Sequence, residues 1–370
     1  MNLRKIIYSI LSSLNYCIPK KKNILIYGGS NLDDNSEAMF RYLLKNTDYN
    51  ITCLADDMMD YDLRPDVKVK KCNYINATIA MLTSKVMIDS SYHTIKMKPT
   101  KKQLFIQCWH GSPLKYMHPA IDINNSEYYS KLYYAADIFK EHMRTYFGAE
   151  DKQMFCGGSP RNDYLFSKTE LPEQFHFSGK SVIWMPTFRH GIGRSESDID
   201  IPVITDNNID VLNKQLKELK IRLYIKPHRL QMNGFQHLVN ESHKNIVLLT
   251  DSVLKENNIP LYIFLSHMDA LLTDYSSVYY DYLLLDRPIG FVIDDFEQYK
   301  KNRGFAFDEP FKLMPGEKIY KMEELLTFFN NLASNIDNFS NERKHVNSIC
   351  NSFTDNNCKR CVDLIKDHLR

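Results

Sequence analysis

Short apolar runs alternate with amphipathic stretches along most of the chain. In the first half, the run NILIYGGS at residues 23–30 precedes the helical segment SEAMFRYLLKN, and NITCLAD, KVMIDSS and LFIQCWHG follow with helix-forming stretches between them. Strand-length runs separated in this way favour βα units around a parallel sheet. We therefore expect a first α/β domain over residues 23–166.

The pattern weakens at residues 166–180, FSKTELPEQFHFSGK, where charged residues, a proline and a glycine collect. It restarts with SVIWMPTFR and continues through the helical IDVLNKQLKEL and the runs IRLYIKPH, NIVLLT, MDALLTD and PIGFVID. This predicts a linker and then a second α/β domain over residues 180–370, with terminal helices. Ligands of such sheets bind beyond the carboxyl ends of the strands, so we expect the site in a cleft between the two domains.

Polar and basic residues recur at the predicted strand ends. His110 follows LFIQCW in the first domain, and the turn that holds Arg161 follows the short run QMF. In the second domain Arg189, His228 and Asp274 each follow an apolar run. A histidine at a strand end is either a catalytic base or a buried structural residue, and the pattern alone leaves both interpretations open.

The segment LLTDYSSVYYDYLLLDRPIGF at residues 271–291 predicts a buried strand that ends at Asp274, followed by a helix. Ser276 or Ser277 is its expected N-cap. A helix N-terminus offers free backbone N–H groups and the positive end of a dipole, which together bind phosphate. Simple capping explains the same serines, but the basic residues at neighbouring strand ends favour a phosphorylated ligand.

The first 22 residues form a separate segment, in which Leu3, Ile7, Ile10 and Leu14 recur at helical spacing before three lysines at 20–22. The segment is short for a bilayer span, which needs about 20 apolar residues. It predicts an amphipathic, membrane-associating helix whose lysines face anionic headgroups. A helix packed on the first domain and an uncleaved signal anchor are the alternatives, and the tyrosine-rich SEYYSKLYYAADIFK is a second candidate membrane contact.

Composition narrows the classes of partner. A chain of 370 residues that is 44% hydrophobic is long enough for two cores, and a net charge of +2 does not indicate a nucleic-acid partner. Eight scattered cysteines are typical of reduced thiols in an intracellular protein. Cys358 and Cys361 form a CxxC without a second pair, and Asp198 and Asp200 are interpreted as solvated loop acids, so we expect no metal site.

The ordered segments DDNSEAMFRYL, CWHGSPLKYM, GSPRNDYL, MPTFR, IKPH and LLTDYSSVYYDYLLLDRPIGFVIDDFEQYKKNRGFAFD resemble the CDP-glycerol glycerophosphotransferase family of teichoic acid primases and polymerases. The resemblance covers roughly residues 23–316 and implies a GT-B fold, two Rossmann-like domains with an active-site cleft between them. It also implies transfer of glycerol phosphate from CDP-glycerol to a hydroxyl of a lipid-linked glycan or polyol-phosphate acceptor, with release of CMP. Ser112 replaces the family's usual threonine and Lys226 a common arginine, and both substitutions keep the chemistry.

The resemblance assigns a role to each candidate residue. It implies that His110 is the general base that takes the acceptor's proton, because an imidazole titrates near neutral pH. It implies that His228 stabilises the charge that develops on the leaving CMP. The remaining assignments are donor-binding roles for Ser276, Ser277, Asp274, Arg189, Lys226 and Arg303, and acceptor-side or cleft roles for Gly111, Ser112, Arg161 and Asn35.

This scheme requires no cofactor, and a magnesium ion that accompanies the diphosphate is compatible with it. We expect a peripheral protein at the cytoplasmic face of the cell membrane. Three alternatives remain: a CDP-ribitol-dependent transferase, a GT-B glycosyltransferase that uses a nucleotide sugar, and an inactive membrane-peripheral binding protein. The pattern leaves open whether one unit or a chain is added, and whether the product is a wall teichoic acid or a capsule.

Overall fold

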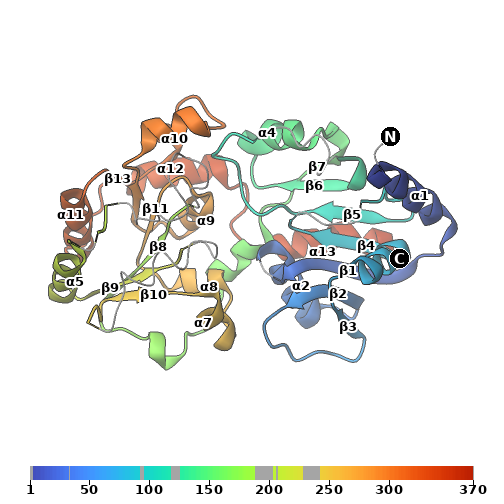
Figure 1. The fold of residues 1–370 in the computed structure, drawn as a ribbon, viewed down its shortest axis with the longest axis horizontal. Coiled ribbons are helices and arrows are strands. Elements are labelled where there is room, and N and C mark those ends of the chain that lie inside the picture. Colours follow the sequence, from blue (N-terminus) through green and yellow to red (C-terminus); the bar gives the residue numbers. More distant parts are fainter. Residues whose placement is uncertain are drawn as a thin grey trace. The chain divides into compact units, whose positions relative to one another are not determined.

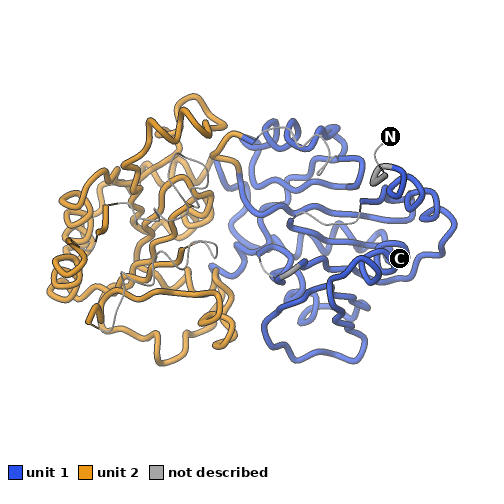
Figure 2. Tube along the Cα trace, viewed as in Figure 1, with its two compact units in different colours: residues 1–112, 117–166, 350–370 blue, residues 113–116, 167–349 orange. Residues whose placement is uncertain are grey.

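The computed structural model describes residues 3–32, 34–91, 96–117, 126–187, 203–205, 207–227 and 242–369. The chain divides into two compact units (Figure 2). Unit 1 contains residues 1–112, 117–166 and 350–370, and unit 2 contains residues 113–116 and 167–349. Each unit is an α/β layer structure around a parallel sheet (Figure 1), as the alternation of strand and helix patterns predicted.

In the described part of unit 1, seven parallel strands form one sheet in the order β3-β2-β1-β4-β5-β6-β7. Their bounds are β1 Lys21–Asn31, β2 Asn50–Asp57, β3 Val67–Lys70, β4 Ser84–Asp89, β5 Leu104–Gln107, β6 Lys131–Tyr134 and β7 Met154–Cys156. The helices are α1 Leu3–Cys17, α2 Asp34–Asn46, α3 Tyr74–Thr83, α4 Asp137–Phe147 and α13 Asn357–Leu369. Apolar side chains on the central strands pack against α2 and α13 and form the core. The near-continuous apolar runs of these strands reflect burial on both faces of the sheet.

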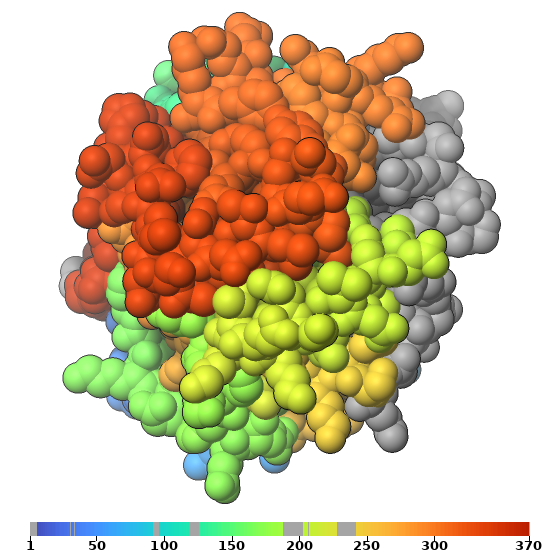
Figure 3. Space-filling model, turned by 90° about the vertical axis from the view of Figure 1, so that its left-hand side faces the viewer, coloured from blue at the N-terminus to red at the C-terminus, as the bar shows by residue number. Residues whose placement is uncertain are grey.

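In the described part of unit 2, six parallel strands follow the order β10-β9-β8-β11-β12-β13. Their bounds are β8 Lys180–Met185, β9 Ile221–Ile225, β10 Ile246–Leu248, β11 Ala270–Thr273, β12 Ile289–Val292 and β13 Glu317–Ile319. The helices are α5 Ile209–Glu218, α7 Asp251–Glu256, α8 Leu261–Ser266, α9 Val278–Tyr282, α10 Phe296–Asn302, α11 Met322–Ala333 and α12 Ser340–Cys350. Helices α5 and α11 lie side by side on one surface of this unit (Figure 3), where Gln215 Nε2 donates to Asn330 Oδ1 at 3.3 Å.

The end of the chain departs from the predicted division. Residues up to 370 were expected in the second domain, but residues 350–370 belong to unit 1. Helix α13 buries Cys361 and Ile365 in the core of that unit. Asp163 fixes its start, because its carboxylate accepts from the backbone N–H groups of Asn357 at 2.8 Å and Cys358 at 2.9 Å. An amphipathic helix encodes an apolar face, but its sequence does not say which core that face will join.

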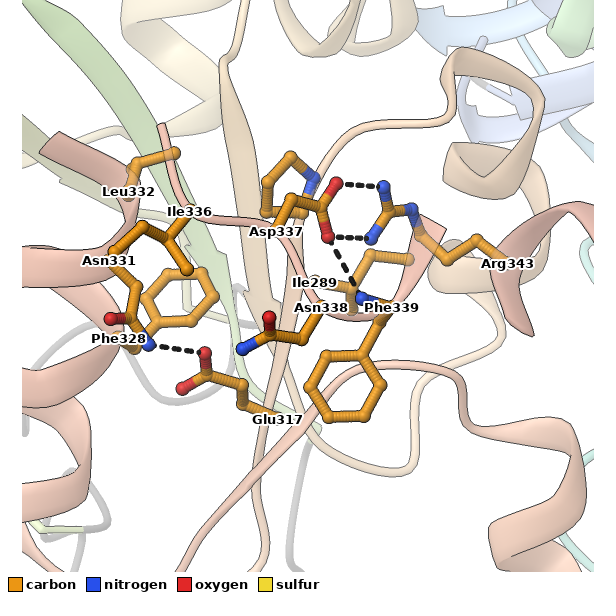
Figure 4. A pocket seen from close by; sticks show the side chains of 11 residues that line it. Ile289, Glu317, Phe328, Asn331, Leu332, Ile336, Asp337, Asn338, Phe339 and Arg343 are labelled. Atoms are coloured by element: carbon orange, nitrogen blue, oxygen red, sulfur yellow. Dashed lines mark hydrogen bonds and ion pairs between the residues drawn. The ribbon is translucent and has the colours of Figure 1, made fainter. Parts of the chain in front are cut away.

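Helix α12 is attached to unit 2 through a buried arginine. Arg343 is 1% exposed, and its guanidinium pairs with Asp337 and, at 3.2 Å, with Asp286. Arg343 and Asp337 also line a pocket of about 10 Å³ (Figure 4). This volume has room for about one water molecule. These ion pairs hold α12 on unit 2.

Helix α1 forms as its periodicity predicted, and it packs on unit 1 through a polar contact. Asn15 is fully buried, and its Nδ2 donates to Gln103 Oε1 at 2.6 Å. No helix among the described residues is both long enough and apolar enough to cross a membrane. The tyrosine-rich alternative contact contains β6, where Leu132 and Tyr133 are buried in unit 1, so these side chains are not available to a membrane.

Candidate functional site

The loop after β5 presents His110 at the carboxyl edge of the unit 1 sheet. Trp109 has a φ of 54°, a left-handed conformation that is unusual for a bulky residue. The turn is held by side chains on both sides, because Trp109 N donates to Gln107 Oε1 at 2.8 Å and Asn35 Nδ2 donates to Trp109 O at 2.6 Å. A strained turn held in this way fixes the position of the residue that follows it.

Asn35 and Arg161, both predicted on the acceptor side, are buried supports of this loop. Asn35 Oδ1 accepts from Arg161 N and from Ser159 Oγ, each at 3.0 Å. The Arg161 guanidinium pairs with Asp34 and donates to His110 O at 2.8 Å. Asn35 is 1% exposed and Arg161 is 6% exposed. These two buried side chains hold the backbone of the His110 loop in place.

The His110 residue itself is exposed, and its ring lies 4.0 Å from the Trp109 ring, centroid to centroid. The protein around the imidazole lowers its pKa below the usual 6.5 through desolvation, and Arg161 lowers it further, whereas Asp34 raises it. The net lowering leaves the ring neutral near pH 7, which is the form that accepts a proton. His110 therefore has the access and the protonation state of a general base.

The chain leaves unit 1 directly after this loop. Gly111 and Ser112 are partly exposed, and residues 113–116 belong to unit 2. There Lys115 forms an antiparallel bridge with Phe305, and Ala306 N donates to Leu114 O at 2.8 Å. The four residues that follow the His110 loop are thus part of the second unit's structure.

Asp274 lies at the carboxyl end of β11, as predicted, but its carboxylate is occupied by a neighbouring loop. It accepts from Thr187 N at 3.0 and 2.9 Å and also from Thr187 Oγ1. Strands β8 and β11 pair through Met185 and Thr273, so the two loops leave the sheet side by side. Asp274 is 1% exposed and positions the loop after β8 through these bonds, and its predicted donor-binding role stays a prediction.

The two serines after Asp274 are partly exposed at the start of α9. The helix begins at Val278 with Ser277 as its N-cap, and the Ser277 side chain makes no capping hydrogen bond. Ser276 Oγ accepts from Val278 N at 3.4 Å. The predicted helix start is confirmed, and simple capping does not account for the Ser277 hydroxyl.

An aromatic cluster ties this segment to α10. The Tyr275 ring stacks on Tyr299 at 4.0 Å between centroids, and its hydroxyl donates to Asp295 Oδ1 at 2.9 Å. Phe305 packs against the same two tyrosines. Arg303, which ends α10, is exposed. The cluster therefore fixes the backbone from which the predicted Arg303 extends.

Of the three other predicted basic residues, the structure describes Lys226 but not Arg189 or His228. Lys226 follows β9, and its Nζ lies 2.6 Å from Asp251 Oδ1, with 10% of the side chain exposed. Its charge is therefore partly neutralised by the first residue of α7. Arg189 and His228 lie outside the described residues, so their assignments stay predictions.

Sequence reasoning missed Thr187 and Lys115. Lys115 Nζ donates to Thr187 Oγ1 at 3.5 Å, so Thr187 connects this lysine to Asp274 within unit 2. The threonine lies inside the segment MPTFR and the lysine inside CWHGSPLKYM, but nothing in either segment indicates a link across 72 residues. The described residues contain no cluster of three His, Cys, Asp or Glu side chains suited to a metal, and Asp198 and Asp200 lie outside them.

The family model for CDP-glycerol:poly(glycerophosphate) glycerophosphotransferases matches residues 10–367. The chain belongs to this family. The match extends over both units and includes every site residue described above.

The relatives of this chain are named for two different polyol phosphates, glycerol phosphate and ribitol phosphate. It is 25% identical over 356 residues to a teichoic acid poly(glycerol phosphate) polymerase of Bacillus spizizenii, with 86% of each chain covered. It is 27% identical over 343 residues to a teichoic acid ribitol-phosphate primase of the same organism, with 84% of this chain and 82% of the relative covered. Identity at this level does not separate a glycerol donor from a ribitol donor.

Comparison with solved structures identifies the fold class. A variant of the wall teichoic acid polymerase TagF, soaked with CDPG, superposes with a TM-score of 0.79 at 20% identity, covering 99% of this chain and 93% of that one. This likeness confirms the predicted GT-B-like fold class, with two parallel-sheet domains.

Proposed function

We propose that the protein transfers glycerol phosphate from CDP-glycerol to a hydroxyl of a lipid-linked acceptor and releases CMP during synthesis of a teichoic acid type of polymer. The observation that carries the proposal is the exposed His110, held on a strained and buttressed loop at the carboxyl edge of a sheet in a chain of this family. An edge of this kind is where α/β sheets bind ligands.

In the proposed reaction, the acceptor hydroxyl oxygen attacks the phosphorus that carries glycerol. A new P–O bond forms as the bond between that phosphorus and the bridging oxygen of CMP breaks. His110 takes the proton from the hydroxyl, and CMP leaves with the electron pair of the broken bond. No protein-bound metal is needed in this scheme. Added EDTA tests whether a magnesium ion that accompanies the diphosphate contributes.

Unit 2 is the proposed donor side. The Ser276 and Ser277 hydroxyls lie in the turn that follows β11, and Arg303 follows α10, whose Tyr299 stacks on Tyr275 of that turn. Asp274 holds the loop that leads to Arg189. Hydroxyl and guanidinium donors suit a diphosphate, whose charge they stabilise. His228 completes the proposed set and acts on the charge of the leaving CMP.

Product analysis tests this function directly. The purified full chain is incubated with a lipid-linked acceptor and, in separate reactions, with CDP-glycerol, CDP-ribitol or a nucleotide sugar. We expect CMP release and a product that is heavier by one glycerol phosphate, or by a series of them if the enzyme polymerises. CMP release with CDP-ribitol alone would identify the ribitol enzyme, whereas nucleoside diphosphate release would identify a glycosyltransferase. Absence of turnover with every donor would support a binding protein.

We also propose that the protein works at the cytoplasmic face of the membrane, with α1 in contact with lipid. Ile7, Ile10 and Leu14 are 45%, 54% and 47% exposed at helical spacing, which is an apolar stripe facing solvent. Lys20 contributes less than expected, because its Nζ donates to Asn15 Oδ1 at 2.6 Å and to Leu82 O at 2.7 Å. Helix α1 is thus packed on unit 1 along one side and presents its apolar stripe on another.

A further inference from the structure

A basic pocket lies at the amino-terminal edge of the unit 1 sheet. Its volume is about 390 Å³, within the range of roughly 300–1,000 Å³ that small-molecule sites occupy. Its lining comes from the first three strands, the residue before β3, and α3. Because the strands are parallel, this edge is the one opposite His110.

The pocket is strongly cationic. Four exposed lysines line it, and the single lining carboxylate, Asp66, already pairs with Arg64 at 2.9 Å. Lys68 and Lys70 are two residues apart on β3, so both side chains point to the same face of the sheet. Thr52 pairs with Lys68 across the two strands. Asn23 Nδ2 donates to Thr52 Oγ1 at 3.3 Å, and both residues add polar groups to the lining.

Protection of a sheet edge does not explain this charge. Lysines are common on edge strands because they prevent pairing with another chain, and β3 is such a strand. Lys21 and Lys22, however, lie on β1, which pairs with β2 on one side and β4 on the other. Lys21 lies two residues before Asn23 and shares its face of the sheet, so lysines from an edge strand and an interior strand line one pocket.

Exposed apolar side chains extend along α3 from the pocket toward the start of the helix. On α3, Tyr74, Ile75 and Ile79 are 68%, 71% and 52% exposed, and Ile79 is itself part of the lining. The end of α3 is also joined to α1, because Gln103 Nε2 donates to Met81 O at 2.9 Å and Gln103 Oε1 accepts from Asn15. A cationic hollow next to an apolar rim is the arrangement that suits a charged headgroup on an apolar tail.

We propose that this pocket binds the phosphate headgroup of an anionic glycerophospholipid, with Tyr74, Ile75 and Ile79 against the lipid chains. A soluble phosphate polymer has the same charge but no apolar part, so it leaves the rim unexplained. The pocket gives unit 1 a second lipid contact in addition to α1, and two contacts fix how the unit is oriented on a bilayer. The inference rests on the proposed membrane association.

The test measures binding of the full chain to vesicles, without CDP-glycerol and without turnover. Phosphatidylcholine vesicles with and without phosphatidylglycerol are compared for the wild type and for the double variant Lys68→Gln with Lys70→Gln. We expect about thirtyfold weaker binding to the anionic vesicles, which corresponds to about 1 kcal/mol for each lysine. Binding to pure phosphatidylcholine should change little, because that headgroup is zwitterionic.

A control pair separates the pocket from general surface charge. Lys300→Gln with Lys301→Gln removes the same charge from two exposed lysines on α10 of unit 2, outside the pocket lining and away from α1 in the chain. This pair should keep most of the wild-type affinity, and the same result in both pairs would mean diffuse attraction and overturn the proposal. Displacement from vesicles by soluble poly(glycerol phosphate) at matched phosphate concentration would identify a polymer site instead. Because the CMP-release assay is separate, loss of this proposal leaves the proposed reaction standing.

Discussion

At the residue scale, the proposed reaction depends on one imidazole. Replacing His110 by Ala removes the base and should lower turnover by roughly 10²-fold or more, while CDP-glycerol still binds. Calorimetric titration gives the affinity, and CMP release gives the rate. The matched control is His345→Ala, an exposed histidine on α12. A near-normal rate in His110→Ala, or a variant that no longer folds, would make His110 a structural residue.

The surroundings of His110 also predict a pH dependence. Its pKa is lowered below 6.5, so the neutral base is present above that pKa and is lost as the pH falls through it. The acidic limb of kcat/KM should therefore have its midpoint below 6.5. Asp34→Asn removes the carboxylate that raises this pKa, and the midpoint should move to lower pH. A midpoint that does not respond to Asp34→Asn would assign the limb to another group.

At the scale of elements, α1 has two sides with different functions. Ser substituted for Ile7, Ile10 and Leu14 should leave the fold intact, because these side chains face solvent. Sedimentation with vesicles should weaken by about a hundredfold, since even partial burial of each of the three side chains in lipid contributes about 1 kcal/mol. Asn15→Ala is the contrasting variant, because it breaks a buried hydrogen bond and should lower the unfolding temperature. Unchanged sedimentation of the triple variant would exclude α1 as a lipid contact.

At the scale of the whole molecule, the last helix of the chain stabilises the first unit. Ile365→Ala deletes a fully buried side chain and should cost about 2–5 kcal/mol of stability. Because α13 packs on β4 and α2, hydrogen exchange should become faster in those elements and remain unchanged in β8 and β11. Lys366→Ala, an exposed neighbour, serves as the control. Faster exchange confined to unit 2 would contradict the assignment of residues 350–370 to unit 1.

The alternation of apolar and amphipathic segments determined two parallel α/β sheets, because burial on both faces makes each strand an unbroken apolar run. It also determined that His110 and Asp274 follow strands. The order of the short motifs along the chain indicated the family. β3 escaped prediction because its sequence, VKVK, exposes three of its four residues. Such a strand shows little of the continuous apolar pattern.

Only the tertiary structure decided which segments meet. Helix α13 packs in unit 1, and Thr187 bonds both Asp274 and Lys115. The Lys20 ammonium is bonded within the protein, and four lysines from two strands line one pocket. The reason is physical: an apolar face or a charged side chain specifies the kind of partner it needs. The partner itself is selected by packing and hydrogen bonds between residues far apart in the chain.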